Sequence, residues 1–273
     1  MIRQNFNADW TVEKGDGNSR MNSFLGNTQT QTVHLPYDAM IHEARTPDTK
    51  NGAQTGFYPG GEYIFQKLFT APQAWQGKPV SLVFEGVYQT ALVYLNGWLL
   101  TRNVNGYAEF TVEAGPYLKY GADNLLKVIA DNSLEPNSRW YTGSGIYRPV
   151  RLLVGNKVYL PQDTVRITTR EADEGFALLD VTAQVQSAST ITERVTLQQT
   201  ICREGTAVLT DRQNLLLRPG ESRTVSFRYC VDSPALWSPE NPNLYASIMQ
   251  VLEGEEELDR EETSFGIRTL SID

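Results

Sequence analysis

Short runs in which hydrophobic and polar residues alternate cover most of the chain, and turn-forming residues separate them. A period of two places successive side chains on opposite faces of an extended strand, so the pattern predicts antiparallel β-structure. Helical periodicity is nearly absent, and we therefore expect an all-β protein. In the first half of the chain we predict strands over 63–69, 81–85, 91–95, 98–100, 125–130 and 150–154.

Two turn signals support the predicted strands and locate the loops between them. Asn96-Gly97 stands between the runs 93–95 and 98–100, and this pair favours a type I′ hairpin because both central residues must take positive φ. Pro59-Gly60-Gly61 indicates an irregular loop before the strand that begins near residue 63. Together these features predict a two-sheet sandwich of jelly-roll type over residues 1–156.

A second alternating series begins after Gly155, Asn156 and Lys157. About seven short strands over roughly 100 residues are typical of an immunoglobulin-like sandwich, which we expect over residues 157–273. The series lacks the Cys-Trp-Cys spacing of antibody domains, and 254–257 is expected to form a charged hairpin tip. The strands predicted here are 165–168, 177–185, 195–200, 213–217, 223–227 and 244–251.

Length and charge narrow the classes of function. A chain of 273 residues is long enough for two domains, each with its own core. The net charge of −8 disfavours nucleic acid and anionic membranes as partners. No run approaches the roughly 20 apolar residues of a membrane helix, and 1–10 has no apolar signal core. We therefore expect a cytoplasmic protein, although a leader removed before this sequence would leave no trace in it.

The cysteines and histidines indicate neither a disulfide framework nor a cofactor. Cys202 and Cys230 lie in strand-like segments, where we expect free buried thiols. The spacing of His34 and His42 matches no zinc signature, and neither stands in a recognisable nucleophile context. We therefore expect no metal and no cofactor.

Several segments carry a family resemblance. Residues 139–154 read Arg-Trp-Tyr-Thr-Gly-Ser-Gly-Ile-Tyr-Arg-Pro-Val-Arg-Leu-Leu-Val, and the chain also contains Phe-Glu-Gly-Val at 84–87 and Val-Tyr-Leu-Asn-Gly at 93–97. Downstream it contains Leu-Trp-Ser-Pro-Glu-Asn-Pro-Asn-Leu-Tyr at 236–245 and Phe-Gly-Ile-Arg at 265–268. These segments resemble the family 2 glycoside hydrolases, the family of β-galactosidases, β-glucuronidases and β-mannosidases, over nearly the whole chain.

The resemblance implies a sugar-binding jelly roll and an immunoglobulin-like domain that support a catalytic (β/α)8 barrel. In that family the barrel begins just after the Phe-Gly-Ile-Arg segment, so the catalytic carboxylates are expected outside residues 1–273. The expected partners are a β-linked carbohydrate, most like a galactoside, the barrel of the same polypeptide and a second copy of the enzyme. Two alternatives remain open: a stand-alone carbohydrate-binding module and a purely structural pair of sandwiches.

The resemblance also implies contact residues. Asp131 and Asn132 match the loop that touches the non-reducing sugar, and Gly60 and Gly61 match a glycine-rich segment that borders the sugar site. A carboxylate suits this task because it accepts hydroxyl protons in charge-assisted hydrogen bonds. An Asp-Asn-Ser run is equally an ordinary turn former, so both interpretations of Asp131 stay open.

The loop at 139–149 is the next candidate. Trp140 could stack on a sugar ring, or it could lock the loop to the sandwich and the barrel together with its neighbours. Arg148 is expected to act as a buried bidentate donor. Positive φ is expected at the glycines. The residues assigned to this structural loop are Arg139, Gly143, Gly145 and Arg148.

Two further features bear on chemistry. Leu35-Pro36-Tyr37-Asp38 stands where many family members have Leu-Pro-His-Asp, which puts any role of that histidine in doubt. Hydrolysis by a retaining glycosidase requires two carboxyl groups about 5–5.5 Å apart. The acidic residues on or near strands of the first domain are better explained as solvent-facing members of the alternating pattern, and they are Glu62, Glu85, Glu109 and Glu113. The chain by itself is therefore expected to be inactive.

Overall fold

The protein is described by a computed structural model that covers residues 1–15, 30–133 and 140–270. The chain folds into two compact units, Ile2–Val154 and Gly155–Asp273, and Met1 groups with the latter. Each unit is a β-sandwich with its own hydrophobic core, and the described residues include no α-helix. No helix in the described ranges is long and apolar enough to cross a membrane.

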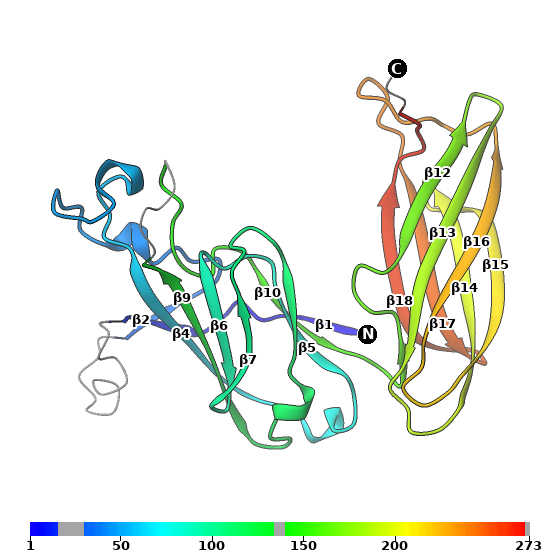
Figure 1. Cartoon of the computed structure of the whole chain (residues 1–273). Helices are drawn as coiled ribbons and strands as arrows, with labels where there is room; N and C mark the ends of the chain where they lie inside the picture. The colour runs from blue at the N-terminus through cyan, green and yellow to red at the C-terminus, as the bar shows by residue number, and fades with distance from the viewer. Residues whose placement is uncertain (16–29, 134–139, 271–273) are drawn as a thin grey trace. The chain divides into compact units, whose positions relative to one another are not determined.

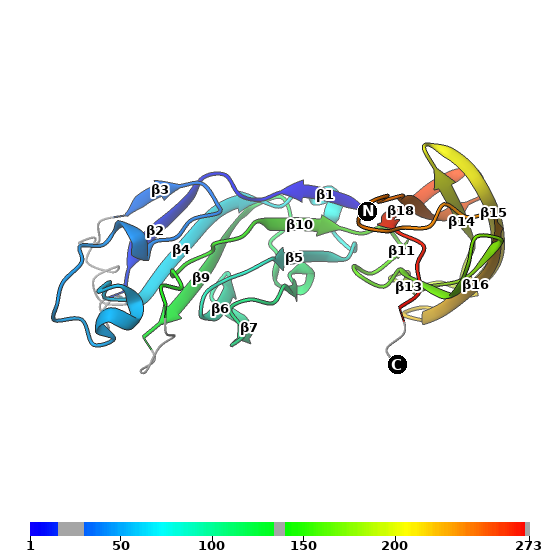
Figure 2. The same ribbon diagram turned by 90° about the horizontal axis from the view of Figure 1, so that it is seen from above.

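The unit Ile2–Val154 is built from two antiparallel sheets. Within the described residues one sheet runs in the order β1-β10-β5-β8 and the other in the order β3-β2-β4-β9-β6-β7. Figure 2 shows β1, β10 and β5 running side by side, as their registers require. The strands are β1 (Ile2–Asn5), β2 (Trp10–Lys14), β3 (Gln31–Val33), β4 (Gly61–Thr70), β5 (Val80–Phe84), β6 (Thr90–Leu95), β7 (Trp98–Asn103), β8 (Phe110–Glu113), β9 (Asp123–Asn132) and β10 (Val150–Val154).

The core of this unit follows the predicted alternation. Along β9 every second side chain is buried, from Asn124 to Asn132, because the strand faces the core on one side only. Large aromatic side chains fill the space between the sheets, among them the fully buried Trp10, Phe65 and Phe84. Four short 3-10 helices lie in the described loops: η1 (Met40–His42), η2 (Gly52–Thr55), η3 (Gln73–Trp75) and η4 (Gly115–Tyr117).

The predicted hairpin at residues 96–97 is confirmed. Asn96 has a φ of 52° and Gly97 a φ of 90°, so both take the positive values that this tight turn requires. The Asn96 side chain also donates a hydrogen bond to the Tyr117 carbonyl oxygen at 2.8 Å. The turn is therefore set by local sequence and fixed by hydrogen bonds between the Asn96 side chain and Tyr117, Asn124 and Leu125.

The unit Gly155–Asp273 consists of long, regular strands (Figure 1). Among its described residues β13 pairs with β11 and β12 along one edge and with β16 along the other, and a second sheet runs β15-β14-β17-β18. The strands are β11 (Val158–Tyr159), β12 (Arg166–Ala172), β13 (Phe176–Ser187), β14 (Glu193–Arg203), β15 (Thr206–Leu217), β16 (Ser222–Asp232), β17 (Tyr245–Glu253) and β18 (Glu256–Phe265).

Two expectations for this unit have different outcomes. The charged hairpin tip is confirmed, because β17 and β18 pair in an antiparallel ladder around Gly254, whose φ is 61°. The expectation of buried thiols is wrong, although both cysteines are free. Cys230 is exposed and Cys202 is half-buried, since each lies on an outward-facing position of its strand.

The strands that the alternation did not indicate are short or polar. β18 reads Glu-Glu-Leu-Asp-Arg-Glu-Glu-Thr-Ser-Phe and has few apolar residues to mark an inner face. It forms because β17 supplies a complete ladder of hydrogen bonds along its length. Tertiary pairing thus overrides a weak local preference for strand.

Candidate functional site

The residues predicted to contact a sugar meet where β4 begins and β9 ends. In the antiparallel register Gly61 pairs with Asn132, and Glu62 pairs with Asp131. Figure 1 shows the end of β9 beside the blue loop segment that precedes β4. The register therefore brings Gly60 and Gly61 next to Asp131 and Asn132, although about 70 residues separate them in the sequence.

Asp131 is half-buried and holds a turn. Its Oδ1 atom accepts a hydrogen bond from the Ser133 backbone amide at 2.9 Å and another from the Ser133 hydroxyl at 2.5 Å. Both bonds go to the same carboxylate oxygen. Among the described residues only Ser133 bonds to this carboxylate, so the side chain can hold the turn through Oδ1 and offer Oδ2 for the charge-assisted bonds that a carboxylate forms with hydroxyl groups.

Asn132 has a different role from the one expected. Its side chain is 1% exposed, and its amide nitrogen donates a hydrogen bond to the Gly143 carbonyl oxygen at 3.0 Å. A buried amide engaged in this way cannot also reach a ligand in solvent. The predicted direct contact is corrected: the Asn132 side chain positions the loop that contains Gly143.

Asp38, the last residue of the Leu-Pro-Tyr-Asp segment, organises this end of the sandwich, a role that was not predicted from the sequence. Its Oδ2 atom accepts a hydrogen bond from the Tyr141 hydroxyl at 2.6 Å. Its Oδ1 atom accepts backbone bonds from Ser144 at 2.9 Å and from Met40 at 3.1 Å. One carboxylate thus ties η1 to the loop that follows β9.

Two tyrosines near Asp38 have raised pKa values, chiefly because they are buried. Burial raises the pKa of Tyr141, and the hydrogen bond to Asp38 and the charge of that carboxylate raise it further. Burial likewise raises the pKa of Tyr63, with smaller contributions from Glu43 and Asp38. Both phenols are therefore hydrogen-bond donors at neutral pH.

The glycines of the loop have the predicted geometry. Gly143 has a φ of 73° and Gly145 a φ of 141°. A Cβ atom on Gly143 would lie 2.7 Å from the Asp38 carboxylate, and one on Gly145 would lie 2.6 Å from the Tyr37 carbonyl oxygen. A side chain at either position would separate Asp38 from the loop that it holds.

The remaining loop residues divide into anchored and exposed side chains. Tyr141 packs against the core and meets Tyr58 edge-on, with ring centroids 5.2 Å apart. Trp140 is 63% exposed, so it does not lock the loop to its own sandwich and its ring is available for stacking. Arg139 lies outside the described residues.

The prediction for Arg148 is wrong. Its side chain is exposed rather than buried, and a single nitrogen, Nη1, donates a 3.4 Å hydrogen bond to the Tyr107 carbonyl oxygen. The guanidinium carbon lies 5.4 Å from the centre of the Tyr147 ring. Burial of a guanidinium requires a paired carboxylate, and here an aromatic face and solvent accommodate the charge instead.

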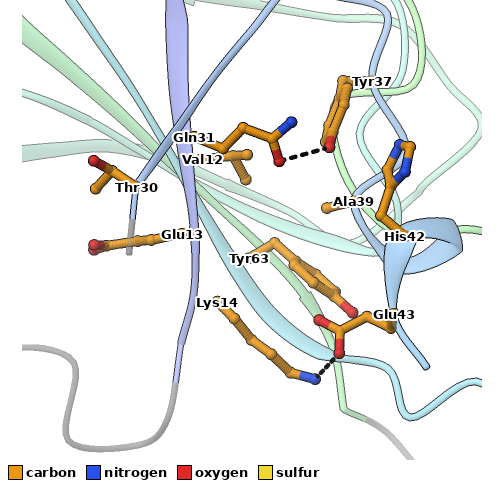
Figure 3. Close-up of a pocket in the computed structure, with 10 residues that line it drawn as sticks. All are labelled: Val12, Glu13, Lys14, Thr30, Gln31, Tyr37, Ala39, His42, Glu43 and Tyr63. Carbon is orange, nitrogen blue, oxygen red and sulfur yellow. Dashed lines mark hydrogen bonds and ion pairs between the residues drawn. The ribbon is translucent and has the colours of Figure 1, made fainter. Parts of the chain in front are cut away.

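A cavity of about 600 Å3 opens near the same end of the unit, on the core-facing side of β2 and β4. Figure 3 shows Gln31, Tyr37 and His42 on one side of it and Lys14, Glu43 and Tyr63 on the other. Val12, Glu13, Thr30 and Ala39 complete the lining. No sequence pattern indicated this cavity, because its residues come from β2, β3, β4, η1 and the segments beside β3 and η1.

The chain matches two family models that together cover most of its length. Residues 10–177 match the galactose-binding domain-like model of glycosyl hydrolase family 2, and residues 158–268 match a model of glycosyl hydrolases family 2. The first match alone extends over more than half of the chain. This chain belongs to glycosyl hydrolase family 2.

Individual relatives align with nearly the whole length of this chain. β-Galactosidase BoGH2A of Bacteroides ovatus is 33% identical over 99% of this chain and 32% of its own length. A β-glucuronidase of Formosa agariphila is 25% identical over 98% of this chain and 30% of its own. The crystal structure of a family 2 member from Bacteroides cellulosilyticus superposes with a TM-score of 0.90 at 29% identity, over 99% of this chain and 36% of that one. The chain thus spans about a third of the length of the curated relatives that it matches.

The four glutamates singled out from the sequence of this family 2 chain lie in or next to strands of the unit Ile2–Val154. Arg151 engages Glu85 at 3.1 Å and Glu109 at 2.9 Å, and each of these carboxylates is about one-third exposed. Glu113 is exposed on β8, and Glu62 is half-buried beside Asp131. Glu62 and Glu113 lie within strands, whereas Glu85 directly follows β5 and Glu109 directly precedes β8, and all four are at least partly exposed.

Proposed function

We propose that this chain forms the non-catalytic front portion of a glycosidase that hydrolyses terminal β-linked glycosides. β-Galactosides are the first candidate substrates, and β-glucuronides and β-mannosides are the alternatives. The name of the Bacteroides ovatus relative, which has 33% identity, supports the first choice, and the name of the Formosa agariphila relative supports the second.

One observation carries the proposal for the site. The Asp131 carboxylate stands at the end of β9 beside Gly61, which is partly exposed and has no side chain to cover its backbone groups, whereas Gly60 is buried. Asp131 would accept hydrogen bonds from sugar hydroxyl groups, and the exposed Trp140 ring would pack on the apolar face of the sugar. Residues of this unit would thereby narrow the substrate entrance of a catalytic barrel.

The proposed partners follow from this role. The catalytic barrel would be part of the same polypeptide, and a second copy of the enzyme would complete an oligomer. The net charge of −8 argues against nucleic acid and anionic membranes. The two free cysteines suit a reducing compartment such as the cytoplasm.

Residues 1–273 alone are expected to be inactive. Purified chain should not hydrolyse nitrophenyl β-galactoside, β-glucuronide or β-mannoside, because the catalytic carboxylates of the family are expected outside residues 1–273 and Arg151 engages Glu85 and Glu109. Turnover that follows the protein through purification and disappears when one of its own glutamates is substituted would contradict this proposal.

The substitution Asp131→Asn in the longer enzyme tests the site. Asparagine keeps an oxygen for the Ser133 turn but removes the charge, so kcat/KM should fall about 10- to 100-fold, or roughly 1.5–3 kcal/mol, while thermal stability stays nearly unchanged. The matched control is Asp123→Asn at the opposite end of the same strand, which should leave kcat/KM unchanged.

Two results would contradict the role of Asp131. A loss of stability equal to the loss of activity would show that the carboxylate only holds the turn. Unchanged kinetics with unchanged stability would remove Asp131 from the site. A coding sequence that continues past Asp273 into a barrel supports the enzyme, whereas a natural stop there favours the alternative of a stand-alone carbohydrate-binding module.

A further inference from the structure

The cavity on the core-facing side of β2 and β4 differs from the Asp131 site. Glu62 and Asp131 are direct partners in the sheet and share one face of it. Tyr63 follows Glu62 and pairs with Ala130, so its side chain points to the opposite face, where it lines the cavity. The strands therefore separate the cavity from the carboxylate proposed to meet the substrate.

The lining combines an apolar floor with polar groups at both ends. Val12, Ala39 and the ring of Tyr63 are each less than 10% exposed and form the apolar part. At one end the Tyr37 hydroxyl donates a 3.3 Å hydrogen bond to Gln31, and the Tyr37 ring stacks on His42 with centroids 5.1 Å apart. This composition and the volume of about 600 Å3 are typical of a small-molecule site.

The opposite end carries a charge pair above a buried phenol. Lys14 Nζ lies 2.7 Å from Glu43 Oε2 and 5.9 Å from the centre of the Tyr63 ring. The Tyr63 hydroxyl is buried and has no hydrogen-bond partner among the described residues. Burial raises the pKa of this phenol, and the neighbouring Glu43 carboxylate raises it further. An unpaired buried donor costs free energy, and a small shift of Glu43 toward it would release Lys14 to bind a ligand.

The charges of the lining exclude an anion as the preferred ligand. Glu43 neutralises Lys14, so this end of the cavity carries no net positive charge to attract an anion. A strongly apolar ligand is also disfavoured, because it would leave the polar groups at both ends without partners. A neutral pyranose fits both ends, since its ring has an apolar C–H face and a rim of hydroxyl groups that both donate and accept.

We propose that this cavity is a second glycan-binding site, which holds one or two neutral sugar residues away from the Asp131 site. The C–H face of the sugar packs over Val12, Ala39 and Tyr63. The hydroxyl rim bonds to Gln31 and Tyr37 at one end and to Lys14 and Glu43 at the other. This site does not depend on the Asp131 contact, so it retains the chain on an oligosaccharide whichever terminal sugar is cleaved.

Titration of chain 1–273 by calorimetry and by amide chemical shifts tests the proposal. The probes are methyl β-galactoside, lactose and the anionic methyl β-glucuronide. We expect saturable binding of at least one neutral probe with a Kd of about 1 mM, with shifts centred on residues 12–14, 31–43 and 63, and at least tenfold weaker binding of the glucuronide. Absence of saturable binding by both neutral probes, or tighter binding of the glucuronide, overturns the proposal.

Substitutions locate the site. His42→Ala removes an exposed ring, and Tyr37→Phe keeps the ring packing but removes the hydroxyl, so neither should unfold the unit. Each should weaken binding at least threefold, and Lys14→Ala at least tenfold. Asp123→Asn, at the opposite end of β9 from Asp131, is the matched control and should leave this binding unchanged. Binding that is lost in Asp131→Asn and retained in the three cavity variants overturns the second site and assigns the sugar to the end of β9.

Discussion

The two sandwiches of this chain use the same kind of secondary structure in different ways. In the unit Gly155–Asp273 the strands β13 to β16 are 11 or 12 residues long, whereas no described strand of the unit Ile2–Val154 exceeds 10 residues. The first unit instead holds ten of the thirteen tyrosines and four of the five tryptophans. Long ladders produce a regular scaffold, and shorter strands leave room for loops that carry polar chemistry.

The two units also differ in where their carboxylates lie and what they bind. In the first unit the Asp38 carboxylate is turned inward and accepts three hydrogen bonds from loop residues. In the second unit Asp180 lies on β13 and pairs across the sheet surface with Arg170 and Arg228. The Asp38 carboxylate therefore sets the conformation of the loops that it joins. Asp180 only adds ion pairs to a sheet whose backbone hydrogen bonds are already in place.

The largest expected effect tests whether the two cores are separate. Phe65→Ala should destabilise the first unit by about 3–5 kcal/mol, and Leu197→Ala should destabilise the second by about 2–5 kcal/mol, because each removes a fully buried side chain. Hydrogen exchange followed by mass spectrometry should show faster exchange in the substituted unit only. Loss of protection in both units from either substitution would mean that they share one cooperative core.

Truncation provides the matched control for this prediction. A chain that ends at residue 156 should remain folded and unfold in a single cooperative transition. The Phe65→Ala substitution should lower the stability of the truncated chain by the same amount as in chain 1–273. A molten or insoluble product would show that the second sandwich completes the first.

A smaller effect is expected at the carboxylate that joins the loops. Asp38→Ala should cost about 2–4 kcal/mol in the first unit, because it leaves the Tyr141 hydroxyl and two backbone amides without an acceptor. Asp38→Asn keeps an acceptor for the backbone amides and should cost roughly half as much. Urea unfolding of both variants measures the difference, and equal stability of all three proteins would contradict the role of Asp38.

The smallest effect concerns acid stability of the second unit. Hydrogen bonds from Arg228 and then Arg170 lower the pKa of Asp180 from 3.8 to about 2. Because the folded pKa lies below the unfolded one, this group stabilises the unit above about pH 4, and the contribution is lost as the pH falls toward 2. Asp180→Asn should therefore lower the Tm near neutral pH and have little effect near pH 2.

Asp232→Asn is the control for this pH dependence. Asp232 is exposed at the end of the neighbouring strand β16, so its substitution should not change the Tm at either pH. Thermal melts of the two variants at both pH values separate the paired carboxylate from an ordinary surface charge. An equal shift in both variants would contradict the effect of the arginines.

Much of the fold could be predicted because most strands are marked by local patterning. The alternation along β9 and β13 identifies the inner face of each strand without reference to its partners, and the pair Asn96-Gly97 specifies its own turn. β18 was not predicted, because its ten residues are mostly charged and it depends on the ladder with β17. Local patterning thus predicts the strands that face a core and fails where pairing alone holds a strand.

The candidate site could be predicted only in part. The resemblance indicated Asp131 and the glycines beside it, but it also suggested a direct contact for Asn132 and a buried position for Arg148. Burial decides both cases, and it depends on packing by segments distant in the sequence. Asp38 illustrates the same limit, because the side chain that it holds, Tyr141, lies 103 positions away.

The sequence by itself determined that this chain is two all-β domains of a glycosyl hydrolase family 2 protein, since alternation, turn residues and family motifs are local properties of the chain. Tertiary structure alone decided which polar groups meet. The register of β4 and β9 placed Gly61 beside Asn132, and the approach of η1 to β2 paired Glu43 with Lys14 and enclosed the cavity. Such contacts arise only when the sheets close over a common core, because hydrophobic burial fixes the loops between the strands in space.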